Sequence, residues 1–155
     1  YSGELVAKRI DSTILRTNFF GRCNVPGKGS FTDWLYNSLV NNNEIKVFKD
    51  VYFSPLSMLT LSKMIKIVIR KKPIGVFNLG SKTGLSKADF SFQFANELGF
   101  SSDSMTPVFI NDVRFIKAKR PNNMQMDSSK FEEILNVKLP SLESEIKRAA
   151  KEYSK

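Results

Sequence analysis

Histidine is absent from this sequence, and cysteine occurs only once, as Cys23. The lack of histidine excludes Ser-His and Cys-His catalytic pairs, histidine general bases and most zinc sites, so we expect no metal site. A single cysteine cannot form an intrachain disulfide, which is typical of a reducing compartment. Because no imidazole is present to activate its thiol, we interpret Cys23 as chemically inert.

Long apolar runs are missing as well. The longest candidate, near residues 64–69, is interrupted by Lys66 and is much shorter than the roughly 20 residues that span a bilayer. The start of the chain has no basic segment followed by an apolar one, as a signal peptide would have. We therefore expect a cytoplasmic protein with no membrane partner.

Acidic residues are few relative to basic ones, 15 against 24, which gives a formal net charge of +9. A basic excess can indicate a nucleic acid or an anionic ligand as partner. The lysines are scattered rather than gathered in one stripe with aromatic residues, and no known nucleic-acid-binding motif is present. Nucleic-acid binding is therefore the weakest of the functions that we leave open.

The remaining pattern is typical of one α/β domain, because predicted strands and helices alternate along 155 residues that are 41% hydrophobic. Ser30 and Ser86 stand where helix N-caps are expected, and apolar residues at helical spacing follow each of them. Residues 1–9 resemble the tail of a helix. The other predicted helices span 31–41, 58–70, 87–98, 130–135 and 141–153, the predicted strands span 13–17, 45–48, 75–80 and 108–110, and residues 111–118 are predicted as a helical turn.

The most informative stretch is 13–21, where a predicted strand leads into Thr17 and Asn18, then Phe19 and Phe20, then a glycine. In open α/β sheets, ligands bind beyond the carboxyl ends of the strands. Polar and aromatic side chains at such an end therefore indicate a ligand site. The alternative is an ordinary strand followed by a turn.

Five segments, in this order, match one family pattern. Residues 1–4 resemble the helix tail K-x-x-G-E, and residues 15–21 are similar to L-R-T-S-W-V-Y-G. Residues 50–61 resemble D-Q-x-G-S-P-T-x-x-x-D-L, and residues 75–90 resemble G-I-Y-H-L-x-G followed by S-x-x-E-F-A. Residues 119–127 resemble R-P-x-x-S-x-L-D. The pattern is that of the extended short-chain dehydrogenase/reductase (NAD-dependent epimerase/dehydratase) superfamily, and it is most similar to dTDP-4-dehydrorhamnose reductase.

This resemblance implies a two-part enzyme. In the family, an N-terminal Rossmann part binds NADPH or NADH through G-x-x-G-x-x-G, and a Tyr-x-x-x-Lys pair on a helix is catalytic. Neither motif occurs here, so the chain has no catalytic residue of its own, and the pair is expected upstream of Tyr1. We therefore expect residues 1–155 to be a single C-terminal sugar-nucleotide-binding domain, with partly parallel strands packed against about five helices.

The family pattern also assigns a cofactor site. Thr17, Asn18 and Phe19 match the strand end that meets the nicotinamide and the sugar. A hydroxyl and an amide can form hydrogen bonds with a carboxamide or with sugar hydroxyls, and an aromatic ring can stack on a pyranose. Expected partners are a nucleotide-sugar substrate and the N-terminal Rossmann part, and a homodimer is left open.

The substrate site extends to two other segments. Ser54 and Pro55 match a loop beside the nucleotide, and Arg120, with Lys119, matches a segment near the diphosphate, which a guanidinium can bind in bidentate fashion. The alternatives are a plain turn and a solvated loop charge. The predicted substrate-binding residues are Asn18, Phe19, Ser54, Pro55, Lys119 and Arg120.

The implied function is reduction of a nucleotide-linked 4-keto sugar for polysaccharide biosynthesis, with residues 1–155 inactive by themselves. Departures from the family pattern leave the substrate open. They are Asn18 and Phe19 for Ser-Trp, Val51 for Gln, Phe53 for Gly, Leu56 for Thr and Thr60 for Asp. An epimerase or dehydratase of the same superfamily, or a non-catalytic regulatory member, is the alternative.

Overall fold

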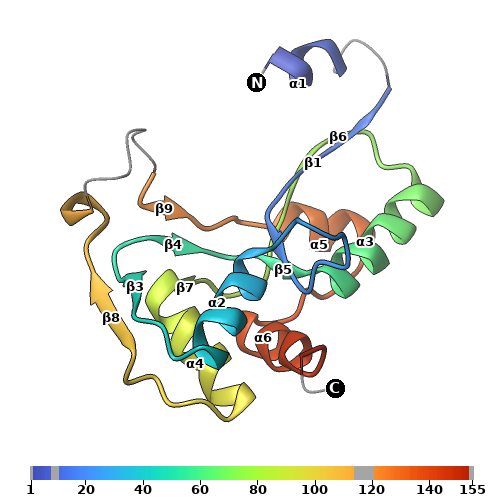
Figure 1. The fold of residues 1–155 in the computed structure, drawn as a ribbon. Coiled ribbons are helices and arrows are strands. Elements are labelled where there is room, and N and C mark those ends of the chain that lie inside the picture. Colours follow the sequence, from blue (N-terminus) through green and yellow to red (C-terminus); the bar gives the residue numbers. More distant parts are fainter. Residues whose placement is uncertain (1, 8–10, 114–120, 154–155) are drawn as a thin grey trace.

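The computed structural model describes residues 2–7, 11–113 and 121–153. Within them the chain is an α/β domain with six α-helices, one 3-10 helix and nine short strands (Figure 1). This confirms the predicted fold class. The helices are α1 (Ser2–Ala7), α2 (Phe31–Val40), α3 (Met58–Lys71), α4 (Lys87–Leu98), η1 (Ile110–Asp112), α5 (Ser129–Leu135) and α6 (Leu142–Ala150). The strands are β1 (Thr13–Thr17), β2 (Phe19–Phe20), β3 (Ile45–Phe48), β4 (Tyr52–Phe53), β5 (Leu56–Ser57), β6 (Gly75–Leu79), β7 (Leu85–Ser86), β8 (Met105–Val108) and β9 (Asn123–Met124).

Parallel pairing dominates among the described strands. β1 pairs with β6 in parallel, in a register that runs from Thr13 opposite Gly75 to Thr17 opposite Leu79. The β2–β5, β3–β8 and β4–β9 pairs are also parallel, whereas β4 and β7 are antiparallel. Since β2 follows β1 after a single residue, the chain leaves the first pair and immediately enters the second.

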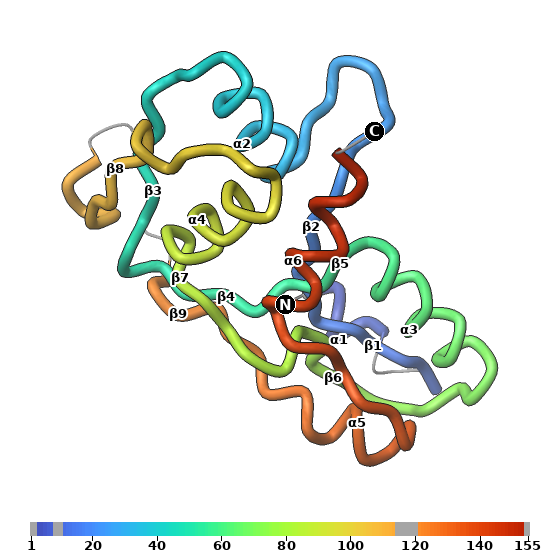
Figure 2. The backbone as a smooth tube through the Cα atoms, turned by 90° about the horizontal axis from the view of Figure 1, so that it is seen from below, coloured from blue at the N-terminus to red at the C-terminus, as the bar shows by residue number. Residues whose placement is uncertain are grey.

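Two hydrophobic cores hold these elements together. The first core lies between α2, α4, α6 and β3 and is rich in aromatic side chains, with Phe90 and Phe94 fully buried. The second core lies between α3, α5 and β6 and contains the buried Phe77 and Phe131. Figure 2 shows α2, α4 and β3 on one side of β2, β5 and α6, and α3, α5 and β6 on the other side. The segment that joins β1 to β2 therefore lies where the two cores meet.

Serine caps explain where the main helices begin. The side chain of Ser30 accepts a hydrogen bond from the Asp33 amide, and the side chain of Ser86 accepts one from the Asp89 amide. Both caps confirm the sequence prediction. At the other end of α4, Gly99 has a φ of 77°, a left-handed conformation that glycine adopts without strain.

Two predicted elements differ clearly in extent, and a third is only partly described. The strand predicted at 108–110 lies at Met105–Val108, and Ile110 begins η1 instead. The pairing of β3 with β8 explains this shift, because it places Met105 opposite Ile45 and buries both side chains. The last helix, predicted to reach residue 153, ends at Ala150 and is followed by a turn. Of the helical turn predicted at 111–118, only residues 111–113 are described, so the prediction is not tested beyond them.

Gly80 follows β6 at a point where the backbone has no room for a side chain. A Cβ atom at this position would lie 2.6 Å from the Ser54 carbonyl oxygen and 2.9 Å from its hydroxyl oxygen. We therefore expect Gly80→Ala to lower the free energy of unfolding by about 1–3 kcal/mol through this overlap. Urea denaturation of the variant would measure the change.

Gly29→Ala is the matched control for this experiment. A Cβ atom on Gly29 would meet only the Asp33 Cβ, at 3.9 Å, which is ordinary van der Waals contact. Its free energy of unfolding should stay within about 0.5 kcal/mol of the natural value. Equal stability of the two variants would contradict the close approach of Ser54 to Gly80.

Candidate functional site

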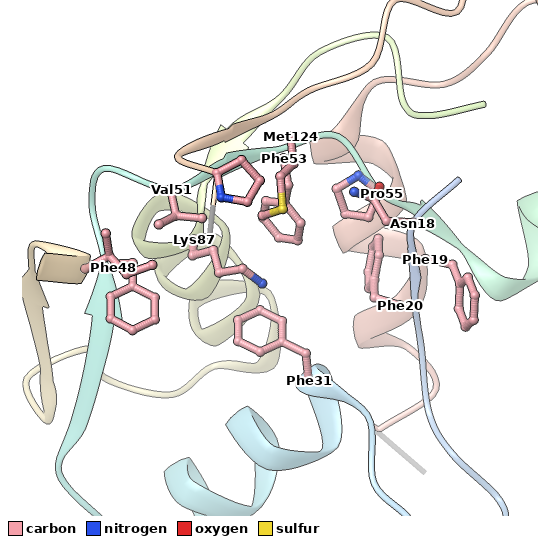
Figure 3. A pocket seen from close by; sticks show the side chains of 12 residues that line it. Asn18, Phe19, Phe20, Phe31, Phe48, Val51, Phe53, Pro55, Lys87 and Met124 are labelled. Atoms are coloured by element: carbon pink, nitrogen blue, oxygen red, sulfur yellow. The ribbon is translucent and has the colours of Figure 1, made fainter. Parts of the chain in front are cut away.

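A pocket of about 320 Å³ lies where the ends of β1, β4 and β9 meet the first residues of α2 and α4. It is lined mainly by apolar and aromatic side chains, with an amide on one wall and an ammonium on another (Figure 3). Such a composition is typical of small-molecule sites, in which a few polar groups set the orientation of the ligand. The lining residues are Asn18, Phe19, Phe20, Phe31, Phe48, Val51, Phe53, Pro55, Lys87, Ile110, Pro121 and Met124.

Asn18 is the single residue between β1 and β2. Its carbonyl oxygen accepts a hydrogen bond from the Leu56 amide at 3.1 Å, which fixes the backbone at the wall of the pocket. Its side-chain oxygen, Oδ1, is buried and has no hydrogen-bond partner among the described residues. A buried acceptor without a partner is costly, and a donor from a bound ligand would satisfy it. The structure thus marks Asn18 as a group that a ligand can engage.

Aromatic rings form the walls around this amide. The ring centroids of Phe31 and Phe53 are 6.3 Å apart, and both rings pack on Phe90, at 5.6 and 5.2 Å. Phe20 meets Phe90 edge to face at 4.9 Å. Phe90 itself is fully buried beneath the pocket. The walls therefore depend on one buried ring, whereas Phe19, which also lines the pocket, is 57% exposed.

Lys87 is the one charged side chain among the described residues that line the pocket. It is the first residue of α4, and its backbone amide donates to the Val51 carbonyl at 2.8 Å. Its ammonium lies 4.3 Å from the ring centroid of Phe31 and 4.4 Å from that of Phe53. Lys87 is not among the site residues predicted from the sequence. The signal was a basic residue in the first turn of a helix, where the helix dipole disfavours positive charge.

The start of α2 is fixed by the carboxylate of Asp33. This group accepts hydrogen bonds from the Ser30 amide at 2.7 Å, the Cys23 amide at 3.0 Å and the Tyr153 hydroxyl at 2.7 Å. Burial alone would raise the pKa of Asp33, but these hydrogen bonds outweigh it and lower the pKa. Burial, together with the nearby carboxylate, raises the pKa of Tyr153 well above its usual range. The network holds Phe31 in place at the wall of the pocket.

The predicted site residues divide into four groups. Asn18, Phe19 and Pro55 line the pocket. Thr17 ends β1 beside Asn18 but is not a lining residue. Ser54 is buried and is not a lining residue.

The Ser54 hydroxyl accepts from the Met126 amide at 2.9 Å, and its carbonyl accepts from the Ser81 amide at 2.9 Å. Its hydrogen bonds therefore join chain segments rather than face the cavity. Lys119 and Arg120 lie outside the described residues, although Pro121, which follows them, lines the pocket.

Within the described ranges no cluster of acidic or cysteine side chains could hold a metal ion. The helices in these ranges are also too short, or too polar, to cross a lipid bilayer.

Comparisons with known proteins agree with this geometry. The family model described as "RmlD substrate binding domain" matches residues 3–155. No curated protein matches the chain.

Solved structures share the fold. dTDP-4-dehydrorhamnose reductase from Bacillus anthracis str. Ames, in complex with NADP, matches with a TM-score of 0.85 and 22% identity over 98% of this chain and 53% of that one. A hypothetical dTDP-4-dehydrorhamnose reductase from Sulfolobus tokodaii has a TM-score of 0.74 and 26% identity over 90% of this chain and 48% of that one. dTDP-glucose 4,6-dehydratase from Streptomyces venezuelae, with NAD and TYD bound, has a TM-score of 0.73 and 17% identity over 97% and 48%.

The chain thus spans about half the length of these structures. At such identities the structural matches establish a shared fold, which reductases and dehydratases have in common. The family model covers nearly the whole chain, and it confirms the resemblance to the extended short-chain dehydrogenase/reductase superfamily. The chain belongs to the family of RmlD substrate-binding domains.

Proposed function

We propose that this chain is the substrate-binding part of an NAD(P)H-dependent reductase that acts on a nucleotide-linked 4-keto sugar, as dTDP-4-dehydrorhamnose reductase does. The observation that carries the proposal is the buried side-chain oxygen of Asn18. It lies without a partner among the described residues, at a ligand-sized pocket beyond the end of β1, in a domain of the RmlD family. A sugar hydroxyl or a carboxamide N–H is the kind of donor that this oxygen would accept.

The incomplete burial of β1 supports the proposal that a second part of the enzyme packs beside this strand. Parallel sheets are usually covered on both faces, yet no residue of β1 is fully buried, and β6 is its only partner among the described strands. In α1, Leu5 is 49% exposed and Val6 is 65% exposed. We infer that an N-terminal NAD(P)-binding part packs against these surfaces and carries the catalytic Tyr-x-x-x-Lys pair.

In this arrangement the cofactor would meet the substrate near Thr17, Asn18 and Phe19. Bound NADPH or NADH would supply the hydride, and the residues of this chain would bind and orient the sugar. Asn18 would accept a hydrogen bond from it, the exposed ring of Phe19 would stack on it, and the Phe31 and Phe53 walls would exclude water. Lys119 and Arg120 stay predicted ligands of the diphosphate.

Turnover by the complete protein tests this function. We expect oxidation of NADPH or NADH in the presence of a dTDP- or UDP-linked 4-keto sugar, and none by residues 1–155 alone. Asn18→Ala should lower kcat/KM by about 10-fold, because one hydrogen bond to the ligand is lost. Asn43→Ala, in the exposed turn after α2, should leave kcat/KM unchanged.

The reaction product distinguishes a reductase from the other proteins that share this fold. An epimerase or a dehydratase would convert the nucleotide sugar without net consumption of NAD(P)H, and a non-catalytic member would convert nothing. Conversion of the sugar without net cofactor oxidation would replace the reductase with one of these sibling enzymes. Reductase activity of residues 1–155 alone would overturn the proposed division of labour.

A further inference from the structure

A second cavity, of about 460 Å³, lies along one face of α2, and we call it the α2 groove. Four of its lining residues are three or four positions apart and therefore share one side of the helix: Trp34, Asn37, Ser38 and Asn41. Figure 2 shows α2 at the edge of the domain, with α4 on its inner side. Among the described residues, none lines both the α2 groove and the pocket at Asn18.

Trp34 supplies an apolar surface in the α2 groove. It is 47% exposed, whereas tryptophan is on average well buried in folded proteins. Its indole stacks on the ring of Phe31, with centroids 5.9 Å apart and an interplanar angle of 24°, and this contact fixes its orientation. A fixed indole that is half exposed at the wall of a cavity presents a flat apolar surface to a ligand.

Two asparagines lie on the same side of α2 as the indole. Asn37 is exposed, and its side chain forms no hydrogen bond with any described residue. The side-chain amide of Asn41 donates to the Asn37 carbonyl at 2.7 Å, which orients Asn41 and leaves its side-chain oxygen as an acceptor. Because an amide can both donate and accept hydrogen bonds, the groove offers both kinds of polar partner next to an apolar surface.

The α2 groove is poor in charge. Asp33 is the one charged side chain among the described residues that line it, in a chain with a formal net charge of +9. Its carboxylate already accepts hydrogen bonds from two backbone amides and from the Tyr153 hydroxyl. A phosphate or carboxylate ligand would meet no cation among these lining residues and would be repelled by Asp33. The groove therefore favours an uncharged ligand with an apolar face and several hydroxyls, which is the chemistry of a neutral sugar.

We propose that the α2 groove binds a neutral oligosaccharide of hexose units, with one pyranose ring stacked on Trp34 and its hydroxyls bonded to Asn37 and Asn41. From Trp34 to Asn41 the helix rises about 10 Å, which is longer than one sugar ring, so more than one unit fits. This site is separate from the pocket for the nucleotide sugar and does not depend on the reductase function. The alternative is that Trp34 only packs on Phe31.

Saturation-transfer NMR on the complete protein would detect this binding, with maltotriose, cellotriose and mannotriose as probes. We expect at least one of them to bind, with a dissociation constant of roughly 1 mM or below. Trp34→Ala should weaken this binding by about 10-fold or more, because the stacking surface is lost. Phe109→Ala removes an aromatic ring of similar exposure, 49%, that does not line the groove, so the affinity should be unchanged.

Asn37→Ala tests the same site if Trp34→Ala does not fold. Because the Asn37 side chain is exposed and bonds to no described residue, its removal should not impair folding. It should weaken trisaccharide binding by about 3- to 10-fold, through the loss of hydrogen bonds to the ligand. Asn96→Ala changes another exposed helical asparagine, outside the groove, and should bind the trisaccharide as the natural protein does.

Competition with dTDP separates this site from the pocket for the nucleotide sugar. Excess dTDP should leave the trisaccharide bound, because the two cavities have no described lining residue in common. Displacement by dTDP would place the trisaccharide in the nucleotide-sugar pocket and overturn the proposal. The absence of binding by all three trisaccharides, or undiminished binding by both Trp34→Ala and Asn37→Ala, would overturn it too. Failure of the natural protein to oxidise NADPH or NADH would overturn the reductase function but not this site.

Discussion

Replacing Phe90 with alanine is expected to lower the free energy of unfolding by about 3–5 kcal/mol, the usual range for a buried phenylalanine. Phe90 lies on α4, is fully buried, and contacts the rings of Phe20, Phe31, Phe53 and Phe94 at centroid distances of 4.9 to 6.2 Å. Removal of its ring would leave a cavity beneath the pocket. Three of the four rings around that cavity are lining residues, so ligand affinity should fall as well.

Urea denaturation followed by fluorescence or circular dichroism would measure the loss of stability. Phe109→Ala is the control, because Phe109 is 49% exposed and contacts the ammonium of Lys49 rather than the core. Its loss should be at most about 1 kcal/mol, the value of an exposed cation–π pair. A change below 1 kcal/mol for Phe90→Ala would show that the aromatic cluster does not support the pocket.

Local chemistry made much of the fold predictable from the sequence. Ser30 and Ser86 each precede a helical pattern of apolar residues, and both are caps in the structure. The strand at 13–17 has the predicted bounds, and it pairs with the strand predicted at 75–80, which ends at Leu79. In these segments the residues that form an element also contain the signals for its start and end.

The pocket was less predictable because it depends on which distant segments meet. Asn18 and Pro55 come together through the pairing of β2 with β5, which no local pattern reveals. The same is true of Lys87, whose partners Phe31 and Phe53 come from two other elements. The family resemblance assigns Ser54 to a loop beside the nucleotide; in the structure its hydroxyl accepts a hydrogen bond from the Met126 amide, and Ser54 is not a lining residue of the pocket. Whether such a residue lines the pocket depends on the direction of its side chain, which its position along the chain does not reveal.

Glu145 is a buried carboxylate that is also absent from the residues predicted from the sequence. The spacing of Leu142, Glu145, Ile146 and Ala149 places it on the apolar face of α6, and its exposed fraction is 0%. An acidic residue on such a face needs partners, because an isolated buried charge is very costly. That requirement was the signal in the sequence.

The partners of Glu145 come from the start of α3. Its carboxylate accepts hydrogen bonds from the Ser57 amide at 2.7 Å and from the Thr60 hydroxyl at 2.8 Å. It also pairs with Arg148 at 3.0 Å, and Arg148 in turn donates to the Thr60 hydroxyl at 2.7 Å. Ser57 ends β5, the strand that pairs with Phe19 and Phe20 of β2. Glu145 thus ties α6 to the strand pair at the pocket.

Glu145→Ala is expected to lower the free energy of unfolding by about 2–4 kcal/mol, because a buried amide and hydroxyl lose their acceptor. The loss should be smaller than for a fully enclosed ion pair, since the Arg148 side chain is 40% exposed and can be solvated. Glu145→Gln keeps the shape and one acceptor oxygen, so about 1–2 kcal/mol is expected.

The order of stability of the natural protein and these two variants shows what the carboxylate contributes. If charge and hydrogen bonding both matter, urea denaturation midpoints should fall from the natural protein to Glu145→Gln and then to Glu145→Ala. Glu133→Gln, at an exposed position on α5, should stay within about 0.5 kcal/mol of the natural protein. If Glu145→Gln matched the natural protein, the ion pair with Arg148 would add nothing to stability, and hydrogen bonding alone would hold α6 against the pocket strands. Equal midpoints for all the variants would contradict the burial of this side chain.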